Sequence, residues 1–376
     1  MQPHDSKQIR ILHVIKSLGR GGAEMLLPET LKAHDRERFE FHYLYFLPWK
    51  NQMVEAIEQA GGRVTCLPAK NNLALLRQAK RIAHYCRDHQ IDLIHAHLPW
   101  AGFVARRVHR LTRILTLYTE HNLQSRYHWA TRWINRLTFN HQSLALAVSD
   151  DVKDSIAEYV RPRIEVRTVL NGVNTDSFVR TCSAAAAPVR TQLNISPESL
   201  VIGTVAVFRF QKRLDVWLEV FQKIQQRCPE ARGIIVGAGP LESDIRQHCN
   251  LLGLDNSVHF PGLQTDVRPY FEAMDVFMMT SSFEGLPIAL LEAMSMQCAI
   301  VATAAGGIKQ VLRDGIDGEA TPVESPEALV DRVLALSKDP DRMAMRKQAA
   351  RQRVVDNYSI RRMVHELEEI YKQWAS

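Results

Sequence analysis

Two glutamates flank a sharp turn in the C-terminal half of the chain. Glu284 lies in the turn SSFEGLP, residues 281–287, and Glu292 lies on the helix that we expect over 287–296. One carboxylate can face a ligand from the turn and the other from the helix. Ionised carboxylates only accept hydrogen bonds, so the pair suits sugar and ribose hydroxyls. A surface glutamate is the plain alternative, but the residues around Glu292 are otherwise apolar.

Two cations, Arg209 and Lys212, follow an apolar segment that we expect to form a strand over 200–207. Cations at the carboxyl end of a strand suit a diphosphate. In isolation they could equally be two solvated charges.

Glycine-rich turns follow an expected strand in each half: GRGGAE at 19–24 and GAGP at 237–240. Glycines there let backbone N–H groups approach a phosphate or a sugar at a helix N-terminus. Neither turn completes the dinucleotide fingerprint G-x-G-x-x-G, since Glu24 occupies the third glycine position of the first. This disfavours a dehydrogenase.

Three histidines lie at the ends of expected strands. His121 follows 114–119, and His95 and His97 end the strand that begins at 91. Side chains two apart in a strand share a face, but no Cys, Asp or Glu sits close in sequence to complete a metal site. We therefore expect His95 and His97 to be structural or to line an acceptor, without a shared metal.

Short apolar runs alternate with helical stretches, which predicts parallel sheets covered by helices on both faces. Residues 176–198 include small residues without periodicity, and we interpret them as a linker. We expect two Rossmann-like α/β domains, 1–175 and 199–357. Ligands bind beyond the carboxyl ends of such strands, so we expect the site in the cleft between two facing domains.

The composition agrees with a two-domain globular protein of 376 residues, 46% of them hydrophobic and 23% charged. The apolar runs are too short to cross a bilayer, and residues 1–5 do not resemble the start of a signal peptide. Six cysteines without a CxxC pair suit reduced thiols, so we expect a cytoplasmic protein without a disulfide framework.

The positive charge is concentrated in the N-terminal half. Residues 1–180 hold 26 Lys and Arg against 17 Asp and Glu, a balance of +9, and the remainder holds 21 against 24, a balance of −3. A basic half favours an anionic partner, such as nucleic acid, a membrane surface or a phosphorylated substrate, although a solvated basic surface would look the same.

Taken together, these residues resemble the retaining glycosyltransferases of family 4, which have the GT-B fold. The resemblance covers nearly the whole chain, and the Glu-x7-Glu element starting with Glu-Gly-Leu-Pro is its most specific part. It also includes Gly-Gly-Ala-Glu at 21–24, His121, Asn-Gly-Val at 171–173 and Gly-Gly at 306–307. The last helix resembles the family's terminal helix, so we expect 358–376 to complete the N-terminal domain.

The resemblance implies a hexosyl- or N-acetylhexosaminyltransferase that takes a sugar from a nucleotide-diphospho-sugar, with no cofactor and no metal. A UDP-sugar is favoured over a GDP-sugar. The implied catalytic residues are His121, Arg209, Lys212 and Glu284. The implied donor-binding residues are Gly21, Gly22, Asn171, Gly237, Leu263, Gly285, Leu286, Pro287, Ile288 and Glu292.

Two positions depart from the family pattern. The usual arginine directly after the first strand of the second domain is Val207 here, so we move the phosphate-binding role to Arg209. The glutamate that commonly follows the Gly-Gly pair is Gln310 here.

The acceptor is expected on the N-terminal domain, where basic and aromatic residues gather. The resemblance implies a lipid-linked acceptor in polysaccharide, glycolipid or other glycoconjugate synthesis, no nucleic-acid partner, and peripheral binding to an anionic inner membrane face. Ordinary helix surface with core tryptophans is the alternative. This zone comprises Arg106, Arg107, Arg110, Arg113, Arg126, Arg132, Arg136, Trp129 and Trp133.

Two other functions stay open from the residues alone. A nucleotide-sugar 2-epimerase shares the two-domain fold. A non-catalytic glycosyltransferase-like binding protein would be favoured by Val207 and Gln310. Nucleotide binding without any activity would identify the latter.

Overall fold

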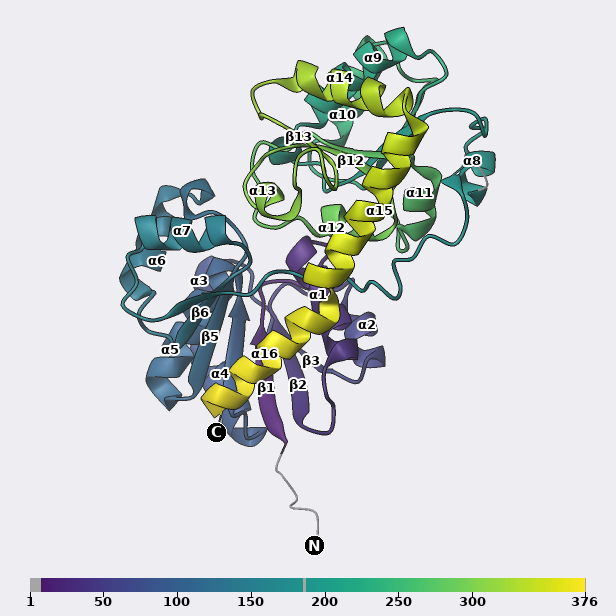
Figure 1. Ribbon diagram of the computed structural model, residues 1–376. Helices are drawn as coiled ribbons and strands as arrows, with labels where there is room; N and C mark the ends of the chain where they lie inside the picture. Colours follow the sequence, from purple (N-terminus) through teal and green to yellow (C-terminus); the bar gives the residue numbers. More distant parts are fainter. Residues whose placement is uncertain (1–7, 185–186, 376) are drawn as a thin grey trace, which may run out of the picture. The chain divides into compact units, whose positions relative to one another are not determined.

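The computed structural model describes residues 8–184 and 187–375, which form two compact units (Figure 1). Unit 1 extends up to Asn171 and takes the chain back from Ile360 onward, and unit 2 is Gly172–Ser359. Residues 1–5, where we expect no signal peptide, lie outside the described residues.

Unit 1 is built on a parallel sheet of seven strands in the order β3-β2-β1-β4-β5-β6-β7. Its strands are rich in β-branched and aromatic residues and are mostly buried, as a sheet covered on both faces requires. The strands are β1 Ile9–Val14, β2 Phe39–Tyr45, β3 Arg63–Cys66, β4 Leu93–His97, β5 Leu115–Glu120, β6 Leu144–Ala147 and β7 Val166–Thr168.

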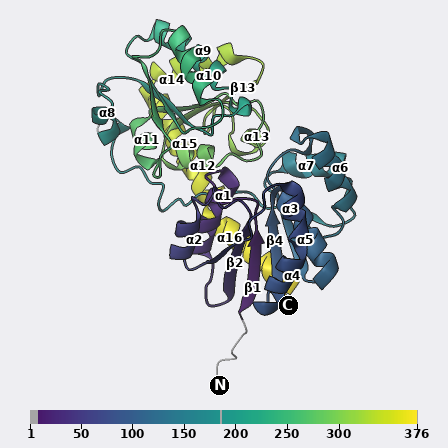
Figure 2. The same cartoon turned by 180° about the vertical axis from the view of Figure 1, so that it is seen from behind.

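Helices cover both faces of this sheet. Figures 1 and 2 show α16 on one face and α4 and α5 on the other. The unit 1 helices are α1 Gly22–Ala33, α2 Val54–Gln59, α3 Asn72–Arg77, α4 Ala79–Asp88, α5 Leu98–Thr112, α6 Trp129–Thr138, α7 Asp150–Tyr159 and α16 Ile360–Ala375.

Unit 2 repeats the architecture with six parallel strands in the order β10-β9-β8-β11-β12-β13. Its core includes Trp217 and Phe221, whose rings stack with centroids 5.4 Å apart. The strands are β8 Val201–Val205, β9 Arg232–Val236, β10 Val258–Gly262, β11 Val276–Met279, β12 Ala299–Thr303 and β13 Glu319–Thr321. The helices are α8 Pro188–Gln192, α9 Leu214–Arg227, α10 Glu242–Leu251, α11 Arg268–Ala273, α12 Ile288–Ser295, α13 Ile308–Val311, α14 Pro326–Ser337 and α15 Pro340–Asn357.

The predicted fold class, with two Rossmann-like sheets, is confirmed, and the differences are local. The sequence pattern predicts one helix over 73–89, but the structure divides it at Gln78, which ends α3 and precedes α4. The short strand β13 and the one-turn helix α8 were not predicted, because each is too short to show a period.

The segment 176–198, which the sequence suggested as a linker, groups with unit 2. Arg180 donates hydrogen bonds to the carbonyl oxygens of Met296, Glu272, Phe271 and Met274. Residues 185 and 186 of this segment lie outside the described residues. Arg180 therefore attaches the segment to unit 2. The small residues of the segment do not predict this attachment.

No helix within 8–184 and 187–375 combines the length and apolar character needed to span a membrane.

Arg190 of α8 provides a test of this attachment. Its side chain is 2% exposed, forms an ion pair with Asp275 (2.7 Å), and donates to the carbonyl oxygens of Ala273 and Ser199. Removing one partner of a buried pair costs about 3–5 kcal/mol. We expect Arg190→Ala to lower the free energy of unfolding of unit 2 by about 3 kcal/mol. Hydrogen exchange of β8 and β11 peptides in increasing urea would measure unit 2 separately from unit 1.

Arg227→Ala is the matched control, because the Arg227–Asp331 pair is exposed and such pairs contribute about 0–1 kcal/mol. Equal effects of the two substitutions would show that the segment does not support unit 2.

Candidate functional site

Lys212 and Glu284 meet in unit 2 at the carboxyl ends of two adjacent strands. Lys212 Nζ lies 2.5 Å from Glu284 Oε1, and their side chains are 16% and 7% exposed. Ser281 Oγ donates to the same carboxylate oxygen at 2.7 Å. Lys212 follows β8 and Glu284 follows β11, between which the strand order reverses. Such a switch point is where open α/β sheets bind ligands.

The loops that carry these two residues are tied together by hydrogen bonds. Thr280 Oγ1 donates to the carbonyl oxygens of Lys212 and Arg213, both at 2.9 Å. The Ser282 N–H donates to the carbonyl oxygen of Gln211 at 2.8 Å. Lys212 is thus held by backbone contacts as well as by its ion pair.

The glycine pair 306–307 packs directly against the backbone of the turn that carries Glu284. Gly306 has φ +54°, and a Cβ there would clash with the carbonyl oxygen of Glu284. A Cβ on Gly307 would clash with the carbonyl oxygen of Gly285. Only glycines permit this approach of two backbones, so the pair positions the turn.

The second glutamate lies one turn into α12. Pro287 is the N-cap residue of this helix and Ile288 its first residue, while Leu286 and Glu292 are 4% and 6% exposed. The buried carboxylate on an otherwise apolar helix is the pattern that the sequence indicated. Gln310 sits in α13, and its carbonyl oxygen accepts from Tyr358 Oη at 2.8 Å.

Arg209, Gly237 and Leu263 lie on loops at the same edge of the sheet. Arg209 is exposed after β8, and Leu263 is 57% exposed after β10. Gly237 follows β9 with φ +128°, where a Cβ would clash with the carbonyl oxygen of Ala206. The structure therefore places all three beyond the carboxyl ends of the strands.

In unit 1, the predicted residues again follow strand ends. Gly21 is the N-cap residue of α1, which begins at Gly22. Asn171 follows β7 and is buried, and His121 follows β5 and is partly buried. Burial lowers the pKa of His121 to about 4, so its imidazole is neutral at pH 7.

Glu120, which the sequence analysis missed, organises the loop of His121. Its buried carboxylate accepts from Tyr118 Oη (2.6 Å), Gln124 Nε2 (2.6 Å) and the backbone N–H of His121 (3.1 Å). Burial raises the pKa of Glu120, and the hydrogen bonds from Tyr118 and Gln124 oppose the shift. A carboxylate directly before the predicted histidine was the available signal.

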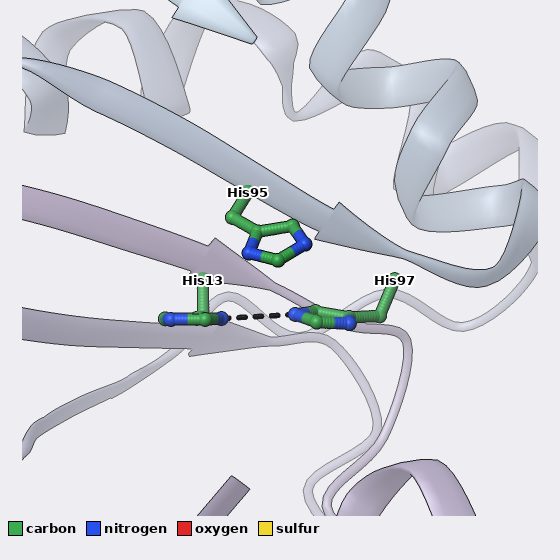
Figure 3. Close-up of side chains that lie close together, drawn as sticks. All are labelled: His13, His95 and His97. Atoms are coloured by element: carbon green, nitrogen blue, oxygen red, sulfur yellow. Dashed lines mark hydrogen bonds between the residues drawn. The ribbon is translucent and has the colours of Figure 1, made fainter. Parts of the chain in front are cut away.

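His13 was also missed, and it forms a buried cluster with His95 and His97 (Figure 3). His13 Nδ1 and His97 Nε2 share a hydrogen bond of 2.9 Å, and His95 bonds to Tyr371 Oη (2.7 Å) and Thr119 Oγ1 (2.6 Å). Burial holds the pKa values of all three imidazoles well below the usual range. The shared face expected for His95 and His97 is present.

The basic zone of unit 1 divides into buried and exposed parts. Including Arg106 was wrong: it is 1% exposed, and its guanidinium donates to Gln142 and Asn135. By contrast, Trp129 and Trp133 on α6 are 68% and 59% exposed, so they are not core tryptophans.

Comparison with known proteins identifies the family of the chain. Residues 20–177 match the family model Glycosyltransferase Family 4, and residues 187–353 match Glycosyl transferases group 1. N-acetyl-alpha-D-glucosaminyl L-malate synthase of Bacillus anthracis is 24% identical over 302 residues, 79% of this chain and 78% of that one. The lipopolysaccharide core biosynthesis mannosyltransferase LpsB of Rhizobium meliloti (strain 1021) is 24% identical over 211 residues, 54% and 60% of the two chains.

Among solved structures, Anabaena Alr3699/HepE in complex with UDP-glucose superposes with a TM-score of 0.88. It is 20% identical, and the match covers 97% of this chain and 100% of that one. The likeness shows a shared fold. With both family models matched in sequence order, this protein belongs to glycosyltransferase family 4 and has the GT-B fold.

Proposed function

We propose that this protein transfers a hexosyl or N-acetylhexosaminyl group from a nucleotide-diphospho-sugar to an acceptor, with retention at the anomeric carbon. The observation that carries the proposal is the Lys212–Glu284 pair at the switch point of unit 2. It supplies a cation for a diphosphate next to a carboxylate for sugar hydroxyls.

Each residue has a proposed role that follows from its chemistry. Lys212 and Arg209 offset the charge that develops on the leaving diphosphate, so the chain's own cations take the part that a metal ion plays in other transferases. Glu292 accepts from the ribose hydroxyls, and Glu284 from the transferred sugar. His121, neutral at pH 7, contributes a hydrogen bond to the sugar.

The proposed donor is a UDP-sugar rather than a GDP-sugar. Support comes from HepE, which has been solved with UDP and with UDP-glucose. The names of the two relatives, an N-acetyl-alpha-D-glucosaminyl L-malate synthase and a lipopolysaccharide core biosynthesis mannosyltransferase, support a sugar of the hexose or N-acetylhexosamine class and a product that is a glycoconjugate.

The proposed acceptor is lipid-linked, and we propose that α6 contacts the anionic membrane surface in which this acceptor lies. Trp129, Trp133 and Leu137 recur every four residues and are all more than half exposed. They form one apolar stripe on the helix, and Arg132 and Arg136 lie on the same helix. Exposed tryptophans with neighbouring arginines suit the interface of an anionic bilayer.

A panel of nucleotides tests the donor. With UDP, GDP, ADP and NAD each at millimolar concentration, we expect UDP to raise the melting temperature, because a ligand at 100 times its Kd stabilises by about 2.7 kcal/mol. The measurement is thermal unfolding followed by fluorescence. A shift with GDP alone would replace the donor class, and a shift with NAD alone would refute the transferase proposal.

The two charged groups of the site are tested by substitution. We expect Lys212→Ala to slow the transfer reaction, measured as the rate at which UDP is formed from the nucleotide-sugar, about 100-fold or more. The substitution removes a cation that offsets the charge developing on the leaving diphosphate. We expect Glu292→Gln to weaken UDP affinity about tenfold in calorimetry, through the loss of a charge-assisted hydrogen bond. Lys223→Ala, on the exposed side of α9, is the matched control and should leave both values unchanged.

The membrane surface is tested by flotation with vesicles. We expect binding to phosphatidylglycerol vesicles that weakens with salt, and little binding to phosphatidylcholine vesicles. Replacing both Trp129 and Trp133 with Ala should abolish flotation, whereas Trp49→Ala, at a tryptophan that is 60% exposed elsewhere in unit 1, should not. Equal binding of all variants would exclude α6 as the membrane contact.

A further inference from the structure

Three imidazoles form a continuous line from the loop after β5 into the interior of unit 1. His121 Nε2 lies 3.4 Å from His97 Nδ1. On the other side of the same ring, His97 Nε2 lies 2.9 Å from His13 Nδ1, the bond drawn in Figure 3. His97 thus uses both of its nitrogens within this line.

The sheet creates the line through its register. His13 on β1 is the register partner of His95 on β4, and His97 stands two residues further along β4 on the same face. These strands are the two between which the strand order of unit 1 reverses, and β5, which leads into His121, is the next strand. The line therefore lies at the switch point of unit 1.

The fourth histidine supports the line without being part of it. His95 is held by Tyr371 Oη and Thr119 Oγ1, and its ring lies 4.3 Å from the ring of His97, centroid to centroid. All four histidines line a cavity of about 30 Å³ whose other walls are mainly apolar. The rings are therefore packed in place, with room beside them for about one water molecule.

Neutral imidazoles in such a line cannot choose their tautomers independently. Each carries a single N–H, and each bond of the line needs one N–H and one lone pair. In one arrangement, His13 donates to His97 and His97 donates to His121, which leaves the outer nitrogen, His121 Nδ1, protonated. In the other arrangement every donor is reversed, and His121 Nδ1 carries a lone pair.

We propose that His97 and His13 are positioning residues that select whether His121 Nδ1 donates or accepts a hydrogen bond. The inference rests on the proposed function for its consequence, since His121 is there assigned to the transferred sugar. A sugar hydroxyl can either donate or accept a hydrogen bond, so the tautomer of His121 decides which orientation of the hydroxyl is bound. His13 acts on this contact from two imidazoles away.

The test reads tautomers directly in the full chain. With ¹⁵N-labelled histidine, long-range ¹H–¹⁵N spectra of the ligand-free protein report the protonated nitrogen of each ring. We expect a single arrangement in His13, His97 and His121. His13→Phe, which removes the hydrogen-bonding group at this end of the line, should leave His121 as a mixture of tautomers. His84→Phe, at an exposed histidine of α4, is the matched control.

Kinetics provide the second readout. We expect His97→Phe to lower kcat/KM for the donor about tenfold, the loss of one hydrogen bond, while the Kd of UDP itself stays unchanged. If UDP fails to bind the wild type, the proposed function fails while the spectra still decide the inference.

Two results would overturn the inference. One is a His121 spectrum in His13→Phe that matches the wild type. The other concerns the nitrogens of His13, His95 and His97, which lie within 4.8 Å of one another. Binding of one equivalent of Zn²⁺ that shifts all three rings would identify a metal site instead of a tautomer line.

Discussion

In each unit, the strand order reverses between two adjacent parallel strands, and this reversal determines where functional groups can gather. The helices that follow the two strands leave toward opposite faces of the sheet, so a space opens beyond their carboxyl ends. In unit 2 the strands are β8 and β11, and their loops bring Lys212 to Glu284. In unit 1 they are β1 and β4, where His13 meets His97. In unit 2, Gly237, Gly306 and Gly307 serve the same geometry, because a Cβ at any of them would clash with a neighbouring backbone carbonyl oxygen.

The contact between Lys212 and Glu284 offsets part of the cost of removing both side chains from water. Taking an ion out of water costs several kcal/mol, and a partner within hydrogen-bonding distance offsets much of that cost. A diphosphate that binds Lys212 would replace one anion with another, so the lysine would keep a partner throughout. Glu284 would retain Ser281 Oγ and gain sugar hydroxyls. In the proposed function, the pair would therefore maintain the site between turnovers without a large loss of electrostatic energy.

Local signals in the sequence were enough to predict the two sheets and the groups at their strand ends. Apolar runs, glycine turns and cations that directly follow a strand each occupy only a few consecutive residues, so no knowledge of distant contacts is needed to recognise them. Long-range pairings were not accessible in this way. His13 lies 84 residues from His97 in the sequence, and the register of β1 on β4 brings them together. In the sequence, Arg106 resembled the other arginines of its helix. In the structure its guanidinium is buried and donates hydrogen bonds to Gln142 and Asn135, which lie in distant segments. The expected site between the two domains remains a prediction.

The final helix connects the histidines of unit 1 to the last part of the chain. Tyr371 of α16 bonds to His95, and Glu368 bonds to His34 and to the backbone N–H of Asp35. α16 groups with unit 1, and the expected completion of the N-terminal domain by 358–376 stays a prediction. Because the whole of unit 2 precedes α16 in the sequence, unit 1 acquires these contacts only after unit 2 has been synthesised. The hydrogen bond between His95 and Tyr371 therefore joins two residues of unit 1 that are synthesised before and after the whole of unit 2.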